Sequence, residues 1–236
     1  MAMPSLPNIS SAISPSLAEI GGLSETASAL TAGSQSVAES LAALVDNKLF
    51  QDAVVALANG LTKEAAVKWA VEAGKVVAGK LPEAELDALA GAEQWLSSTD
   101  TADQLAGLLK DNAMQGPGAW AAQAAAWADM AAGAAEGEAP PYDKAVGSAV
   151  KLAAALTAND WPLVESALSE ADLAAAVDGF SAPDLQIDVA GAAADAASAM
   201  AAGDAGAPTP EQQLNDLLKP FVELGLKIAA GQLGAG

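Results

Sequence analysis

Apolar residues recur along the chain at helical spacing, and no run of β-branched residues indicates a strand. A helix is expected to start near Ser36, and Thr62 has the side chain of an N-cap. Gly60 is expected to end a helix in the left-handed conformation, and Pro82 suits the first residue of the next helix. In the first half of the chain, helices are predicted over 36–45, 49–59, 62–80 and 82–98. The pattern predicts an all-α fold, an irregular or orthogonal bundle of about eight to ten short Ala-rich helices.

Alanine and tryptophan dominate the next helical segment, over 119–135, on almost every side. A helix that is apolar all round is normally buried, so we place it at the centre of the bundle. Asp143 is the expected cap of a further helix over 144–158. Because alanine methyl groups bury little area, the larger side chains should anchor the core. The predicted anchors are Trp69, Trp95, Trp120, Trp127 and Leu152.

Composition divides the chain into four parts. Residues 1–33 are rich in Ser, Gly and Pro, and we expect a flexible arm there, followed by the helical bundle over 34–202. The sequence GDAGAPTP predicts a linker over 203–210. An amphipathic helix is expected over 211–236, with a kink at Pro220.

The last helix presents one apolar face. Such a face packs either on its own bundle or in the groove of a partner protein, and the sequence leaves both alternatives open. The candidate partner-binding residues on this face are Leu214, Leu217, Leu218, Phe221, Leu224 and Ile228.

The chain is strongly acidic, with thirty acidic residues, ten lysines and a formal net charge of -20. Eleven of the acids and no basic residue lie between Leu152 and Leu218. Two interpretations of this acidic stretch remain open. It either keeps the protein soluble or forms a surface that attracts a basic partner. Nucleic-acid binding is not expected, because it depends on cationic side chains. The candidate residues of the acidic surface are Asp172, Asp178, Asp184, Asp188 and Asp195.

The residue types needed for much chemistry are missing, since the chain has no His, no Cys and no Arg. Ser148 and Lys151 match an S-x-x-K motif without its companion motifs, and we interpret them as part of a solvated helix face. Paired carboxylates such as Glu83 and Glu85 are interpreted as caps and solvated residues. The acidic cluster over 178–188 lacks the ligand spacing of an EF-hand. We therefore expect no enzymatic activity, no cofactor and no built metal site.

Targeting signals are not evident in the sequence. Residues 1–18 lack a basic start and contain three prolines, and no uncharged helical stretch is long enough to span a membrane. We therefore expect a cytoplasmic protein, with export by a signal-independent route left open.

Tryptophan motifs from about residue 50 to 160 resemble those of a family of uncharacterised bacterial proteins, a domain of unknown function. The motifs are AVKW ending at Trp69, AEQWLSSTDTADQLAGLLKDNA with Trp95, GPGAWAAQAAAW with Trp120 and Trp127, the pair Pro140 and Pro141, and KAVGSAVKLAAAL from Lys144. The resemblance implies an association with type VI secretion loci. It implies no catalytic residues.

These observations favour a non-enzymatic protein-interaction module. With the resemblance added, its expected role is that of an adaptor, chaperone or carried component of a type VI-like secretion system. The expected partner is another protein, either basic or part of a secretion apparatus. One alternative is an acidic immunity-type inhibitor or nucleic-acid mimic that blocks a basic partner. A distant alternative is a carboxylate-based hydrolase.

Overall fold

The computed structural model describes residues 6–9, 22–34, 36–98, 105, 109, 116–133, 140–158 and 208–233. Across these ranges the chain forms α-helices and one 3-10 turn and no strand, so the predicted all-α fold is confirmed. The elements are α1 (Glu25–Thr31), α2 (Val37–Asp46), α3 (Phe50–Gly60), α4 (Lys63–Val76), η2 (Ala78–Lys80), α5 (Glu83–Ser97), α7 (Pro117–Gly133), α8 (Tyr142–Thr157) and α12 (Pro210–Ala229).

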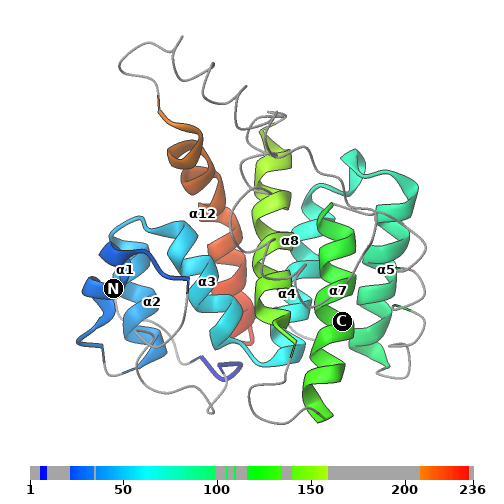
Figure 1. The fold of residues 1–236 in the computed structure, drawn as a ribbon, viewed down its shortest axis with the longest axis horizontal. Coiled ribbons are helices and arrows are strands. Elements are labelled where there is room, and N and C mark those ends of the chain that lie inside the picture. The colour runs from blue at the N-terminus through cyan, green and yellow to red at the C-terminus, as the bar shows by residue number, and fades with distance from the viewer. Residues whose placement is uncertain are drawn as a thin grey trace.

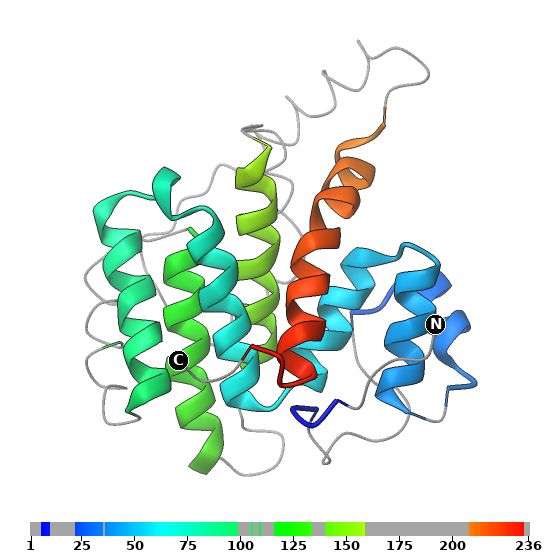
Figure 2. The same ribbon diagram turned by 180° about the vertical axis from the view of Figure 1, so that it is seen from behind.

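Helices α4 and α8 form the middle of the bundle (Figure 1). On one side of them lie α7 and then α5, and on the other side lie α3, α2 and α1. The last helix, α12, lies between α3 and α8 and also contacts α4, as the view from behind shows (Figure 2). An element from the end of the chain therefore sits in the middle of the fold.

Small side chains allow the central helices to pack closely. Every residue of α8 from Ala145 to Ala155 is buried, and α7 contacts α4, α5 and α8. The predicted burial of the Ala/Trp helix is confirmed, but α7 lies between the α4–α8 pair and α5 and not at the centre of the bundle. Four of the five predicted anchors are fully buried, whereas Trp120 is only partly buried and packs on the edge of the core.

Helix ends follow the predicted caps in part. Thr62 accepts a hydrogen bond from the amide of Ala65, as predicted, and Ser36, near which a helix was expected to start, accepts one from the amide of Glu39. The prediction that Gly60 ends its helix in the left-handed conformation is wrong. Gly60 is the last residue of α3, and the extended Leu61 is the C-cap. Pro82 is the N-cap of α5 rather than its first residue, and Asp143 lies inside the first turn of α8.

The described parts of the N-terminal 33 residues pack on the bundle instead of forming a free arm. Ser24 caps α1, and the buried carboxylate of Asp52 on α3 accepts hydrogen bonds from the Ser24 amide and hydroxyl at 2.7 and 3.0 Å. Ile9 forms an isolated antiparallel bridge with Leu61. The described residues of this segment are thus held by the Asp52 carboxylate and by the pairing with Leu61.

The start of α12 lies within the predicted linker. Thr209 and Gln212 form a capping box, in which each side chain accepts from the other residue's backbone amide, and Pro210 is the first helical residue. The helix therefore carries its own start signal in the sequence PTPEQQ.

Candidate protein interface: the α12 groove

The apolar face of α12 lies against the chain's own bundle. Four of its six candidate residues, Leu214, Leu218, Phe221 and Ile228, are at most 3% exposed, and Leu217 and Leu224 are half-buried against the core. The helix packs on α3, α4 and α8. We call the surface of these three helices that receives α12 the α12 groove. Of the two alternatives left open by the sequence, the structure shows packing on the bundle.

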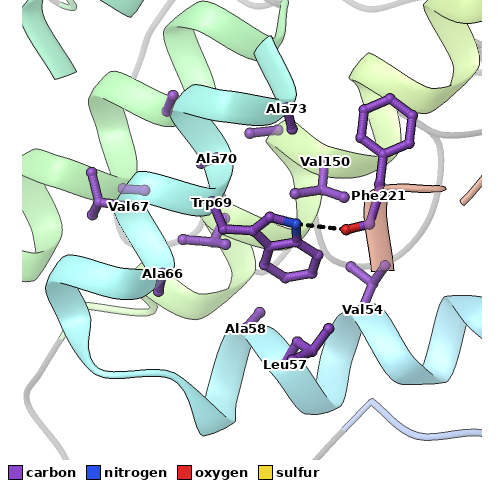
Figure 3. Packing of buried hydrophobic residues seen from close by; sticks show 14 of the residues in the cluster. Val54, Leu57, Ala58, Ala66, Val67, Trp69, Ala70, Ala73, Val150 and Phe221 are labelled. Carbon is purple, nitrogen blue, oxygen red and sulfur yellow. Dashed lines mark hydrogen bonds between the residues drawn. The ribbon is translucent and has the colours of Figure 1, made fainter. Parts of the chain in front are cut away.

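Trp69 of α4 forms the centre of the α12 groove. Its indole is fully buried, and Nε1 donates a hydrogen bond of 2.9 Å to the carbonyl oxygen of Phe221 on α12. Figure 3 shows the ring with Leu57 and Val54 of α3 and Val150 of α8 around it. This bond satisfies the one polar atom of the largest core side chain, so the position of Trp69 depends on α12.

Gly225 lets α12 approach the tryptophan ring. A Cβ atom at this position would lie 2.8 Å from Cε2 of Trp69 and 3.0 Å from Cδ1 of Leu57. Both neighbours belong to the buried core, so neither can move aside without disturbing other contacts. The groove thus selects a residue without a side chain at this point of the helix.

Asn215 connects the start of α12 to the start of α3. Its Oδ1 accepts hydrogen bonds from the amides of Phe50 and Gln51 at 2.9 and 3.3 Å, and its Nδ2 donates to the carbonyl of Lys48 at 2.8 Å. Helix α3 has no side-chain cap of its own, because Leu49 occupies its N-cap position. A residue from α12 therefore serves as the missing cap.

The other end of α12 is held by an N-terminal residue. Asn8 donates from its backbone amide to the carbonyl of Ala229 at 3.0 Å and from its side chain to the carbonyl of Ile228 at 2.6 Å. The carbonyl of Asn8 accepts from the amide of Thr62 at 2.8 Å. These bonds satisfy carbonyl groups that every helix C-terminus leaves without an intrahelical partner.

Sequence reasoning identified the apolar face but missed three of these polar and small contacts. Asn8, Asn215 and Gly225 belong to no motif, and each acts on a residue far away in the sequence. The only local signal is that Asn215 and Gly225 interrupt an otherwise apolar helical stripe. A polar or small residue in such a stripe indicates close contact with a specific neighbour.

The acidic candidates lie elsewhere in the chain. Asp172, Asp178, Asp184, Asp188 and Asp195 all fall outside the described residues, as does the 178–188 cluster. In the part of the chain that is described, no group of three or more acidic side chains is arranged to hold a metal ion. No described helix combines the length and apolarity needed to cross a bilayer.

Ser148 and Lys151 are buried in α8, so their interpretation as a solvated face is wrong. Lys151 lines a small hollow between α3 and α8 together with Asn59, Asp143 and Lys144. Ser148 does not line this hollow. Among the described residues, this hollow thus holds only one of the two S-x-x-K side chains.

The Glu83 and Glu85 pair is divided between two environments. Glu83 is exposed, whereas Glu85 is buried and its two carboxylate oxygens accept from the amides of Gly116 and Ala119 at 2.8 and 2.9 Å. Glu85 thus caps the start of α7, the segment with the sequence GPGA. A Cβ at Gly116 or Gly118 would overlap Glu85, which explains both glycines.

Comparison with known families extends the resemblance noted in the sequence. The model of DUF6931, a family of unknown function, matches residues 40–179. No curated protein and no solved structure matches the chain. The matched range contains α3, α4, α5, α7 and α8, and it ends before α12 begins. Since the match takes in more than half of the 236 residues, the chain belongs to the DUF6931 family.

Proposed function

We propose that this protein is a non-enzymatic protein-interaction module whose family domain binds an amphipathic helix. One observation carries the proposal. The family range supplies the α12 groove, and the helix that fills this groove comes from outside the family range. Helix-in-groove binding is a recurrent mode of protein recognition, read by apolar residues at i, i+3, i+4 and i+7. Leu214, Leu217, Leu218 and Phe221 have that spacing.

The resemblance to proteins associated with type VI secretion loci supports a setting for this module. In that setting it acts as an adaptor, a chaperone or a carried component of a secretion system. A cytoplasmic protein that leaves the cell by a signal-independent route fits such a role.

An acidic surface adds a second element to the proposal. Between residues 159 and 207 the sequence has nine acids and no lysine. A surface of one sign speeds the approach of an oppositely charged partner and orients it. We place Asp172, Asp178, Asp184, Asp188 and Asp195 on this surface as the residues that face a basic partner.

Affinity capture from the native host tests the proposal. Full-length protein is compared with a variant in which the five candidate aspartates are changed to asparagine. A matched control changes five exposed acids of the bundle to amides: Asp46, Glu83, Asp87, Glu211 and Glu223. The interaction module should recover a specific protein that the aspartate variant binds more weakly but still retains, because the α12 groove also holds it, and that the control variant binds like the full-length protein. Recovery of no protein by any form would contradict it.

A second candidate function is an acidic inhibitor that blocks a basic partner, such as a toxin with a cationic active site. The net charge of -20 favours it directly. Salt distinguishes the two functions, because a partner held by charge alone is released as ionic strength rises, whereas a partner that also fills the apolar α12 groove is weakened by salt but retained. The inhibitor function therefore predicts that moderate salt releases the captured partner.

A carboxylate-based hydrolase is the distant third candidate. It needs two free carboxylates in one cleft. Both oxygens of Glu85 hold backbone amides of α7, so this residue supports the hydrolase function poorly. Loss of activity without loss of stability, on changing one carboxylate pair, is the result that would support it.

A further inference from the structure

The hollow between α3 and α8, called the α3–α8 hollow from here on, has a volume of about 30 Å³ and is partly open. Space of this size takes about two or three waters, or one small polar group. Its lining includes Asn59 of α3, Gly22 from the segment before α1, and Asp143, Lys144, Gly147 and Lys151 of α8. Four of these six residues have polar or charged side chains, so the α3–α8 hollow suits a small polar ligand.

Gly147 gives room to the α3–α8 hollow at a cost to its own helix. It is buried inside α8, where glycine is less favourable than alanine because its unfolded backbone has more freedom to lose. Among the described residues, a Cβ atom there would meet Cγ1 of Val54 at an ordinary contact distance of 3.9 Å. At Gly225, by contrast, a Cβ atom would lie 2.8 Å from the Trp69 ring. The space that Gly147 leaves, and not a close neighbour, therefore explains this glycine.

The charges around the α3–α8 hollow favour an anion. Asp143, Gly147 and Lys151 follow one another at intervals of four residues and Lys144 precedes Lys151 by seven, so one face of α8 carries all four. Two ammonium groups and one carboxylate leave this lining with a positive net charge, whereas the whole chain carries -20. A positive lining in an acidic protein attracts a negatively charged ligand.

Two of the lining residues have donors for such a ligand. Lys151 is only 5% exposed and already interacts with another group of the protein, yet its ammonium has three N–H donors and can bind a ligand as well. Asn59 uses one N–H of its side-chain amide on the carbonyl of Val55, at 2.9 Å, and has a second N–H to donate. Burial strengthens such bonds, because little water competes for the donors.

We propose that the α3–α8 hollow binds the carboxylate group of a small monocarboxylic acid. A carboxylate has three non-hydrogen atoms, which suit the volume, and a single negative charge, which suits the lining. Lys144 and Lys151 attract its oxygens, Asn59 donates to them, and Gly147 leaves them room. Phosphate and sulfate have five non-hydrogen atoms and exceed this space. The site does not depend on the α12 groove, so each proposal stands or fails by its own test.

Titration with sodium acetate, followed by NMR of the amide groups of the full-length protein, tests the site. Acetate replaces chloride at constant ionic strength, so general screening stays the same and the shifts report a preference for the carboxylate. The amides of Gly22, Asn59 and Gly147 should shift together and saturate with one dissociation constant. Gly33 and Gly79 do not line the hollow, and their amides should keep their positions.

Two variants change the site in different ways. Gly147→Ala fills the room and should weaken acetate binding about tenfold, while it raises the unfolding temperature because alanine is the better helix former. Lys144→Gln removes one positive charge and should weaken binding by up to about fivefold. The matched controls are Gly79→Ala, where a Cβ has open space, and Lys48→Gln, beside the opposite end of α3. Both should bind acetate like the unchanged protein.

Weaker acetate binding in Gly147→Ala together with a higher unfolding temperature would support the site, because loss of structure cannot explain that combination. Absence of a saturating shift at the lining amides would overturn the site. Equal shifts at the control amides would do the same, since they indicate a general effect of the salt. Acetate binding that neither Gly147→Ala nor Lys144→Gln weakens would also overturn it.

Discussion

Glycine occupies three positions where a neighbouring helix leaves no room for a side chain. Gly74 of α4 faces Leu89 of α5, Gly118 of α7 faces the backbone of Glu85, and Gly225 of α12 faces the Trp69 ring. A methyl group at any of them would lie closer to its neighbour than real Cβ atoms come. At Gly118 the nearest atom belongs to the backbone, so a side chain there requires α5 and α7 to move apart.

Changing Gly118 to alanine should destabilise the protein by about 3 kcal/mol, because the new methyl group overlaps the carbonyl of Glu85 and pushes α7 off its cap. Urea unfolding measures the free-energy change. Gly79→Ala is the matched control, since nothing lies within 4 Å of a Cβ there. Equal stability of the two variants would contradict the close packing of α5 and α7.

Tyr142, the only tyrosine of the chain, reports on the start of α8. Burial raises the pKa of its phenol above the ordinary 10.0, and the charges of Asp143 and Glu64 raise that pKa further. Above pH 10 the unfolded chain releases this proton while the folded chain keeps it, so the stability provided by Tyr142 decreases as pH rises through the folded pKa.

Absorbance of the phenolate should therefore appear at higher pH in the folded protein than in denaturant. Tyr142→Phe removes the titrating group and should flatten the loss of stability in this alkaline range. A folded midpoint equal to the denatured one would show that the ring is solvated and that the environment of α8 differs from the one described.

Helix α12 has a well-capped N-terminus, but its middle lacks one backbone hydrogen bond. Its capping box supports the first turn, whereas Pro220 lies exposed within the helix and cannot donate to the carbonyl four residues before it. Most of its stability therefore comes from the groove rather than from its own backbone.

Replacing Pro220 by alanine should stabilise the protein by about 1–3 kcal/mol, because the helix ladder gains a hydrogen bond and no packed side chain is lost. Thermal and urea unfolding both measure this gain. Lys219→Ala, at the exposed neighbouring position, should change stability by less than about 0.5 kcal/mol. A loss of stability in Pro220→Ala would mean that α12 needs a bend at this point.

Local signals in the sequence predict where most helices lie along the chain, but not which other helices they pack against. The helix start near Ser36, the cap at Thr62 and the burial of α7 each follow from residues a few positions apart, and these predictions are confirmed. The prediction for Gly60 is wrong, and the extended Leu61 that ends α3 pairs with Ile9, a residue far away in the sequence. Such contacts follow from the whole fold and leave no periodic pattern.

The contacts of α12 show the same limit. Its face is predictable from periodicity, yet the choice between bundle and partner depends on Trp69 and Asn215, whose partners lie more than 150 positions away. The burial of Ser148 and Lys151 escapes prediction for a related reason, because α8 is surrounded by α3, α4, α7 and α12. A polar residue on α8 is therefore buried even though polar side chains are usually exposed.

Net charge acts on the molecule as a whole. Thirty acids and ten lysines give a self-repulsion that opposes the compact state. Exposed ion pairs, such as that of Lys75 with Glu72 at 3.0 Å, offset little of it, since each contributes about 0.2–1 kcal/mol.

Raising the ionic strength from a few millimolar to about 0.15 M should therefore increase the unfolding temperature, because screening weakens the repulsion more than it weakens the few exposed pairs. NaCl and KCl should act alike, since screening depends on ionic strength and not on the ion. A decrease with salt would mean that attractive charge pairs outweigh the repulsion.

The hydrogen bonds of Asn8 place an early part of the chain beside the end of α12. When the two ends of the molecule are pulled apart, the force acts first on these few hydrogen bonds. We expect them to break one after another, each at a low force, before the helices of the bundle move past one another. We expect a small force to break the hydrogen bonds of Asn8 and to detach α12 before the remaining helices unfold. Single-molecule stretching should record this as an early, low-force step, a mechanical weakness that would suit a protein drawn through a narrow passage.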